Sequence, residues 1–208
     1  MKRMLATLIG LMALPFAAPA QVQPPDDPVG VATATYFATN FARLKAVADL
    51  QPNPETFRDA MKPLAEATPG FFGGSFIDTN FVIREVYYPR DFLARGFDLK
   101  KVRQLDHFWT LMRQEPSPQL SEPGHGNIMQ PRLIAMRYPV MKDGELAAVV
   151  SFFVRTESFL EAIGLGQAKA YRITCRGTVA EEDGKLGDNP RTVTISLPAN
   201  DWLIEYVI

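Results

Sequence analysis

Two arginine–tyrosine pairs carry the clearest chemistry in this sequence. Arg84 and Tyr88 lie in the run FVIREVYYP, and Arg132 and Tyr138 lie in the run RLIAMRYP. Alternate residues of a strand share a face, so each pair is expected on one face of its strand. An arginine fork with aromatic walls binds both oxygens of a carboxylate at once. These four residues therefore predict a pocket for a small organic anion.

Two further side chains complete the predicted ligand-binding set. Met136 shares the strand face of Arg132 and Tyr138, and Trp109 lies with His107 on a predicted helix that would cover the pocket. The arginines and Trp109 also have simpler interpretations. A solvated or salt-bridged arginine at a sheet edge is the more frequent case, and Trp109 fits an ordinary core equally well.

The patterns of common catalytic and metal sites are missing from the sequence. His107 and His125 are the only histidines and lack the spacing of metal ligands. Ser75 and Ser151 lack the G-x-S-x-G motif, GLGQAK does not complete a dinucleotide fingerprint, and EEDGKLGDN lacks the order of a calcium loop. We therefore predict that the protein is not an enzyme and has no catalytic residues, metal site or cofactor.

The first twenty residues have the pattern of a secretory signal peptide. A basic start, MKR, precedes the apolar run Met4–Leu14, and Ala18-Pro19-Ala20 is a small-residue cleavage site. We expect cleavage after Ala20 and a periplasmic or secreted protein, with a retained N-terminal anchor as the alternative. No later apolar run approaches the roughly 18 residues of a membrane span, so none is expected after the signal peptide.

Residues 21–208 have the length of one domain, and their charge excludes one class of partner. The whole chain carries 22 basic and 23 acidic residues, without the concentrated basic face that nucleic acid would require. Cys175 is the only cysteine, so no internal disulfide is possible. Its place in the apolar run RITCRG predicts a buried, unreactive thiol.

The start of this domain is predicted to be helical, over residues 29–66. Phe37, Phe41, Leu44 and Ala48 recur at spacings of three and four, which places them on one face of a helix over Val29–Leu50. Such a face must pack against the sheet or against a second copy of the chain. A homodimer through Val29–Leu50 is therefore one expectation.

The sheet and its covering helices are predicted within residues 70–208. Thr79-Asn80 and Asp143-Gly144 each separate two β-rich runs and predict hairpins, and 99–113 has helical spacing. Leu146–Val154 is apolar on both faces, so this strand is expected in the middle of the sheet. Three further β-like runs follow, AYRITCRG, RTVTISL and DWLIEYVI. Adjacent strands with segregated helices predict an α+β fold with a mainly antiparallel sheet.

Several short motifs together resemble the extracytoplasmic PAS-like sensor domains of the Cache and CHASE type. A long amphipathic helix precedes Tyr88-Pro89 and Gly96-Phe97-Asp98-Leu99. Pro139-Val140, the turn Asp143-Gly144, an apolar strand and a short helix follow, and Asp201-Trp202-Leu203 begins the last strand. The resemblance covers roughly Val29 to Ile208. It implies a single Cache-type domain with a five-stranded antiparallel sheet and a small-molecule pocket between one sheet face and its covering helix and loops.

The resemblance also implies a function in sensing. Domains of this kind usually feed a kinase, cyclase or chemoreceptor, whereas no second span and no output domain are evident in this sequence. We therefore expect an exported sensor module that recognises a small, anionic organic molecule and acts through a membrane-bound receptor or kinase. The arginine-x-tryptophan pattern of amino-acid-binding double Cache sensors is missing. The alternative is a ligand-free interaction module that works through its amphipathic N-terminal helix.

Overall fold

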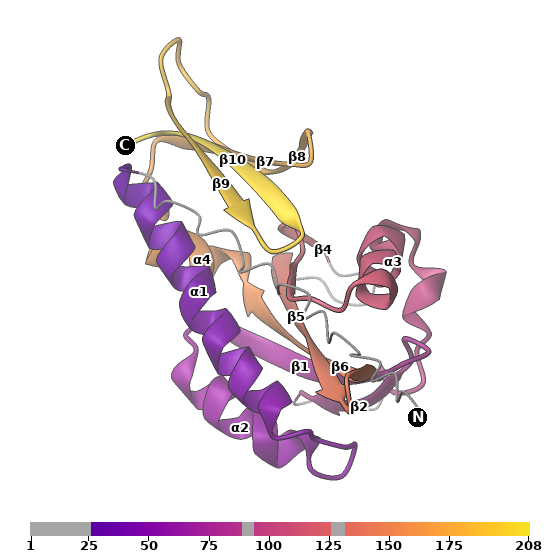
Figure 1. Cartoon of the computed structure of the whole chain (residues 1–208). Coiled ribbons are helices and arrows are strands. Elements are labelled where there is room, and N and C mark those ends of the chain that lie inside the picture. Colours follow the sequence, from indigo (N-terminus) through magenta and orange to yellow (C-terminus); the bar gives the residue numbers. More distant parts are fainter. Residues whose placement is uncertain (1–25, 89–93, 126–131) are drawn as a thin grey trace, which may run out of the picture.

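A computed structural model describes residues 26–88, 94–125 and 132–208, which form one long helix, two antiparallel sheets and three shorter helices (Figure 1). The helices are α1 (Pro28–Asp49), α2 (Phe57–Ala67), α3 (Asp106–Gln114) and α4 (Thr156–Ala162). The first sheet holds β1 (Phe71–Asp78), β2 (Ile83–Tyr87), β3 (Gln119–Leu120), β4 (Gly124–His125), β5 (Arg132–Lys142) and β6 (Glu145–Arg155). The second holds β7 (Ala170–Cys175), β8 (Thr178–Asp183), β9 (Arg191–Leu197) and β10 (Asn200–Val207). The predicted signal peptide lies outside the described residues.

The first sheet confirms the predicted antiparallel arrangement. Its main path has five strands in the order β2-β1-β6-β5-β3, and the short β4 also pairs with β5. The apolar strand β6 lies in the middle, between β1 and β5. Asp143 and Gly144 make the β5–β6 turn with φ values of 53° and 84°, the left-handed conformation that a tight hairpin requires.

The last four strands form a second sheet, in the order β8-β7-β10-β9, which the sequence analysis did not predict. Three of these strands were expected from their β-like composition. β8 was missed because its charged end, Glu181–Asp183, resembles a turn. Cys175 is buried in β7, and burial raises the pKa of its thiol, as expected for an inert cysteine.

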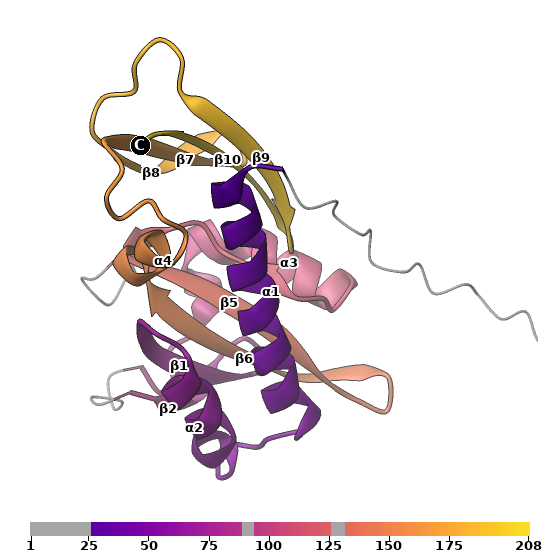
Figure 2. The same cartoon turned by 90° about the vertical axis from the view of Figure 1, so that its left-hand side faces the viewer.

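Helix α1 joins the two sheets (Figures 1 and 2). The ring of Phe37 stacks on Phe159 of α4, with 5.0 Å between ring centroids, and meets Trp202 of β10 edge-on at 5.2 Å. Phe37 and Phe41 are only 1% and 8% exposed. Of the two alternatives for this apolar face, the sheet or a second copy of the chain, the structure shows packing within the chain.

The segment after β2 departs from its predicted structure. A single helix over 99–113 was expected, but two short 3₁₀ turns, Leu99–Lys101 and Arg103–Leu105, precede α3. Val102 has an extended backbone, with φ −98° and ψ 94°, which interrupts the helix. The short strands β3 and β4 follow α3. Helix α2 includes Pro63 and continues to Ala67.

Side chains cover the first sheet on both faces, as the two-sided apolar pattern of β6 predicted. The face toward α1 belongs to the main core, which includes Val150 and Phe152. The opposite face carries a second cluster that includes Phe81, Trp109 and Val149. Within the described ranges, no helix is long and apolar enough to cross a membrane.

Candidate functional site

A cavity of about 390 Å³ lies on the face of the first sheet that points away from α1. Its walls come from Ile83 of β2 and Tyr88 just after it, from the segment 94–105, from the segment 121–124, and from β5 and β6. Most of the lining side chains are apolar: Ile83, Ala94, Phe97, Leu99, Val102, Leu105, Pro123, Leu133, Ala135 and Phe153. This is the pocket position that the resemblance implied, between a sheet face and the covering segments.

Arg137 of β5 is a buried cation in the wall of this cavity. Its side chain is surrounded by aromatic rings, with the guanidinium carbon 5.0 Å from the ring centroid of Phe108 and 5.1 Å from that of Trp109. Only 5% of the residue is exposed, its Nη1 has no hydrogen-bond partner, and no ion pair is formed by Arg137 within the described residues. Cation–π contacts offset only part of the cost of such burial.

The charge of Arg137 survives this burial. Desolvation lowers its pKa to about 10, against the opposing effect of the nearby Glu122 carboxylate. A group with this pKa is still protonated at neutral pH. Arg137 lines the cavity, so its positive charge lies in the wall, and a carboxylate would supply the opposite charge.

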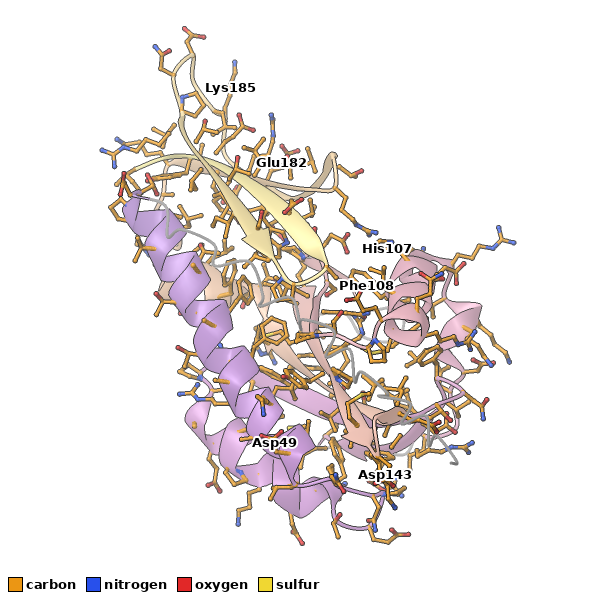
Figure 3. The ribbon with its side chains drawn as sticks, in the orientation of Figure 1. Asp49, His107, Phe108, Asp143, Glu182 and Lys185 are labelled. Atoms are coloured by element: carbon orange, nitrogen blue, oxygen red, sulfur yellow. The ribbon has the colours of Figure 1, made fainter. Side chains whose placement is uncertain are left out.

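Glu122 also lines the cavity, but its charge is already paired. The Nε of Arg176, in the β7–β8 turn, donates to Oε1 of Glu122 over 2.5 Å, and Nη2 of Arg176 also contacts this oxygen. The Arg176 guanidinium lies 5.2 Å from the Phe108 ring centroid. Figure 3 labels Phe108, which belongs to α3 and contacts both arginines. The cluster of Arg137, Arg176 and Glu122 thus has a net charge of +1.

Tyr88 closes another part of the wall. Its ring stacks near Phe153 at a centroid distance of 6.2 Å and contacts Phe72 edge-on at 5.9 Å. Burial raises the pKa of Tyr88, so the phenol remains neutral. The ring lies over Gly73 of β1 so closely that a Cβ at Gly73 would overlap it. A residue without a side chain is therefore needed beneath Tyr88.

Of the six residues predicted to bind ligand, Tyr88 lines this cavity in the described structure and Trp109 adjoins it. Trp109 is 3% exposed and stacks on Phe81 at 4.7 Å, with Arg137 against its ring. Trp109 lies in the second hydrophobic cluster, which fits the alternative of an ordinary core residue. It also contacts Arg137 of the cavity wall, so it lies close to the position predicted for a covering residue.

The other four predicted residues lie away from the cavity. Arg84 pairs with Asp78 at 2.6 Å near the β1–β2 turn, and Arg132 pairs with Glu181 of β8 at 2.6 Å. Both arginines thus match the salt-bridged alternative. Met136 and Tyr138 point to the opposite sheet face, into the core beneath α1. The physical reason is the two-residue period of a strand, because the cavity takes the odd-numbered side chains of β5.

Sequence reasoning missed Arg137, although a signal for it was present. Arg137 shares its strand face with Leu133 and Ala135, so a charged residue interrupts an otherwise apolar surface next to a central strand. A buried arginine at such a position needs a partner, and none was identifiable in the neighbouring sequence. Across the residues that the structure describes, no cluster of potential metal ligands is formed.

Comparison with solved structures gives three informative similarities. An extracellular ligand-binding receptor from Desulfohalobium retbaense aligns with 87% of this chain at 16% identity and a TM-score of 0.66, although the chain spans only 39% of that receptor. The ligand-binding domain of the Pseudomonas aeruginosa amino acid chemoreceptor PctC, in complex with GABA, aligns at 11% identity and a TM-score of 0.62. That alignment covers 85% of this chain and 94% of the domain.

The third similarity is to the ligand-binding domain of the Pseudomonas fluorescens chemoreceptor CtaA in complex with L-leucine, with 15% identity and a TM-score of 0.59. It covers 84% of this chain and 87% of that domain. No protein-family model and no curated protein matches the sequence. At these identities the similarity establishes the fold, and the chain has the Cache-type fold of extracellular ligand-binding sensor domains, as its sequence motifs implied.

Proposed function

We propose that this protein is an extracytoplasmic sensor module that binds a small organic anion in the cavity of the first sheet, with Arg137 as the anion-binding residue. The observation that carries the proposal is the burial of Arg137 without an ionic partner, beside an apolar cavity of about 390 Å³. Pockets of this size and character suit small organic ligands. Tyr88 forms part of the cavity wall, and the Trp109 ring contacts the guanidinium group of Arg137.

The structural neighbours support a ligand of this kind. PctC was solved with GABA and CtaA with L-leucine, and both molecules carry a carboxylate. We propose that the module functions in the periplasm or outside the cell and reports occupancy to a separate membrane or envelope partner. This part of the proposal rests on the pattern of residues 1–20 and on the sensing role of the similar domains.

The proposal is tested by thermal-shift measurements with a panel of carboxylates and their uncharged amides. A ligand that binds only the folded protein at 100 times its Kd should add about 2.7 kcal/mol to the free energy of unfolding. We expect this stabilisation for a carboxylate but not for its amide, and we expect it to disappear in Arg137→Met.

Arg84→Met is the matched control for this experiment. It removes a guanidinium group of the same size, but one that is half-exposed and paired with Asp78, away from the cavity. Equal stabilisation of wild type and Arg84→Met, with none in Arg137→Met, would support the proposal. Full stabilisation of a folded Arg137→Met protein by the same carboxylate would refute it.

A further inference from the structure

The charges and the lining side chains of the cavity indicate a narrower class of ligand than small organic anions in general. We infer that the ligand is a monocarboxylate with an apolar body and no amino group, such as a branched-chain or aryl-substituted carboxylic acid. This inference rests on the proposed function of the cavity and concerns the class of molecule that fits it. It separates this protein from the structural neighbours, whose bound ligands GABA and L-leucine each carry an ammonium group.

The first argument is the charge balance. Arg137 and Glu122 are the charged residues among the described lining, and Glu122 is engaged by Arg176. One carboxylate on the ligand would reduce the net charge of this cluster from +1 to zero. A second carboxylate would find no further cation in the described wall, so a dicarboxylate would leave one charge uncompensated.

The second argument concerns acceptors for an ammonium group. An ammonium group has three donors to satisfy and is best met by a free carboxylate. The one carboxylate of the described wall already accepts from Arg176. The Ser121 hydroxyl donates to the Glu122 carbonyl oxygen at 3.2 Å and accepts from the Ala135 amide at 2.8 Å. The side-chain acceptors that remain in the described wall, on Ser121, Gln104 and Tyr88, are neutral and supply no negative charge to an ammonium group. Burial of an amino group here would leave its donors poorly satisfied.

The third argument is the character of the remaining wall. Three separate parts of the chain, the segment 97–102, β5 and β6, contribute the apolar side chains of Phe97, Leu99, Val102, Leu133 and Phe153. A ligand body rich in hydroxyl groups would lose its hydrogen bonds to water against this surface, whereas a hydrocarbon body would gain from burial. The carboxylate would then contact Arg137 while the hydrocarbon part fills the apolar space.

Isothermal titration calorimetry with ligand pairs that differ in one group tests this inference directly. The first comparison is 4-methylpentanoate with L-leucine, and the second is 3-phenylpropanoate with L-phenylalanine; in each pair only the amino group differs. We expect at least one of the acids to bind tenfold or more tightly than its amino acid. We expect 4-methylpentanamide and 3-phenylpropanamide, which lack the negative charge, to give no measurable binding.

Variants of Arg137 test whether this residue is responsible for binding of the preferred acid. Arg137→Met should abolish binding of the preferred acid, Arg137→Lys should retain weakened binding through its charge, and Arg84→Met should bind as wild type does. Circular dichroism establishes that each variant is folded. The wild-type ligand pairs provide a test that requires no variant, should Arg137→Met fail to fold.

The possible failures have different meanings. Equal or tighter binding of the amino acids would overturn the inferred class and leave the proposed anion sensor intact. Binding of the amides as tightly as the acids would overturn both. If neither acid binds but a dicarboxylate such as succinate does, with loss of binding in Arg137→Met, the class is overturned and the proposed function is retained. If no carboxylate binds the folded wild-type protein, both are overturned.

Discussion

Arg137 is buried in a position that costs stability, and under the proposed function the same position favours binding of an anion. A charged group without a partner costs several kcal/mol to bury, and the two aromatic contacts of this guanidinium group return roughly 0.5–2 kcal/mol each. A carboxylate in the cavity would supply the missing partner. The cost of burial in the empty state then contributes to the selectivity for an anion, because a neutral ligand leaves the charge uncompensated.

A direct consequence is that Arg137→Met should stabilise the ligand-free protein. Methionine fills a similar space, contacts aromatic rings favourably through its sulfur and removes the buried charge. We expect an increase of about 1–3 kcal/mol in the free energy of unfolding. A change of this size raises Tm by roughly 2–4 °C per kcal/mol in a domain of this length. Thermal melting without ligand measures it, and a lower Tm for the variant would contradict the claim that Arg137 is unpaired.

Ligand affinity should depend on pH through the same residue. Burial lowers the pKa of Arg137 to about 10, so the cation that binds a carboxylate is present at neutral pH and is lost as the pH rises through this value. We expect a constant affinity between pH 7 and 9 and a decline above pH 10, measured by calorimetry on protein shown to be folded by circular dichroism. An affinity that stays constant up to pH 11 would argue against titration of the binding group in this range.

At the scale of residues, the sequence located a strand that lines the cavity better than it located the side chains that face the cavity. The correct strand, β5, was identified, but Arg132, Met136 and Tyr138 were assigned to the pocket from a face that packs elsewhere. A strand that is apolar on both faces gives no indication of which face meets a cavity. The packing of α1 on one face of the sheet determines that the cavity lies on the other face. The local spacing of residues does not reveal such long-range packing.

At the scale of elements, β1 packs closely against Tyr88, the residue that follows β2. We expect this packing to keep the Tyr88 ring in the cavity wall. Gly73→Ala places a methyl group where the Tyr88 ring now lies, so the ring must move out of the cavity wall. We expect this variant to lose about 1–3 kcal/mol of stability, as overpacked sites do, and to bind the preferred carboxylate at least tenfold more weakly. Thermal melting and calorimetry measure the two effects.

Gly187→Ala controls for the loss of a glycine, because nothing lies within 4 Å of an added Cβ at that position. Addition of Tyr88→Ala to Gly73→Ala tests the cause. If the clash is with the Tyr88 ring, the stability losses of the two single variants will not add in the double variant. Additive losses would place the effect of Gly73→Ala elsewhere in the sheet.

The elements themselves were predicted where local chemistry specifies them. The Asp143-Gly144 turn and the spacing of Phe37 and Phe41 gave the central hairpin and α1, since both signals depend on neighbours within a few residues. The second sheet was not predicted, because nothing local distinguishes strands that extend one sheet from strands that form another. Trp202 illustrates this: its ring is fully buried against Phe37 and Phe159, which are distant in sequence.

At the scale of the whole molecule, the segment Gln119–Gly124 connects the cavity to the second sheet. Leu120 donates its amide to the Pro198 carbonyl oxygen at 2.8 Å and accepts from the side-chain amide of Asn200 at 3.3 Å, so β3 contacts the β9–β10 turn. Glu122 lines the cavity and pairs with Arg176 of the β7–β8 turn. We therefore expect a change in this part of the cavity wall to act on two turns of the second sheet.

Ligand binding should consequently protect amides beyond the first sheet. With the preferred carboxylate bound, we expect slower hydrogen exchange in β3, at the β7–β8 turn around Gly177 and at the β9–β10 turn around Asn200. Ordering of the cavity wall reduces local opening, and the contacts of this segment extend that effect to its neighbours. The β5–β6 turn serves as an internal control. Asp143 lies at the other end of the molecule from Glu182 of the second sheet (Figure 3), so its exchange should not change.

Glu122→Gln separates the contact with the β7–β8 turn from the contact with the β9–β10 turn. Glutamine keeps the shape of the side chain but removes the charge that pairs with Arg176, while the bonds of Leu120 to the β9–β10 turn remain. We expect ligand-dependent protection to decrease at Gly177 and to persist at Asn200. Protection confined to the first sheet in the wild-type protein would contradict this prediction. It would show that the contacts of Gln119–Gly124 are structural only, and that ligand binding in the cavity does not affect the second sheet.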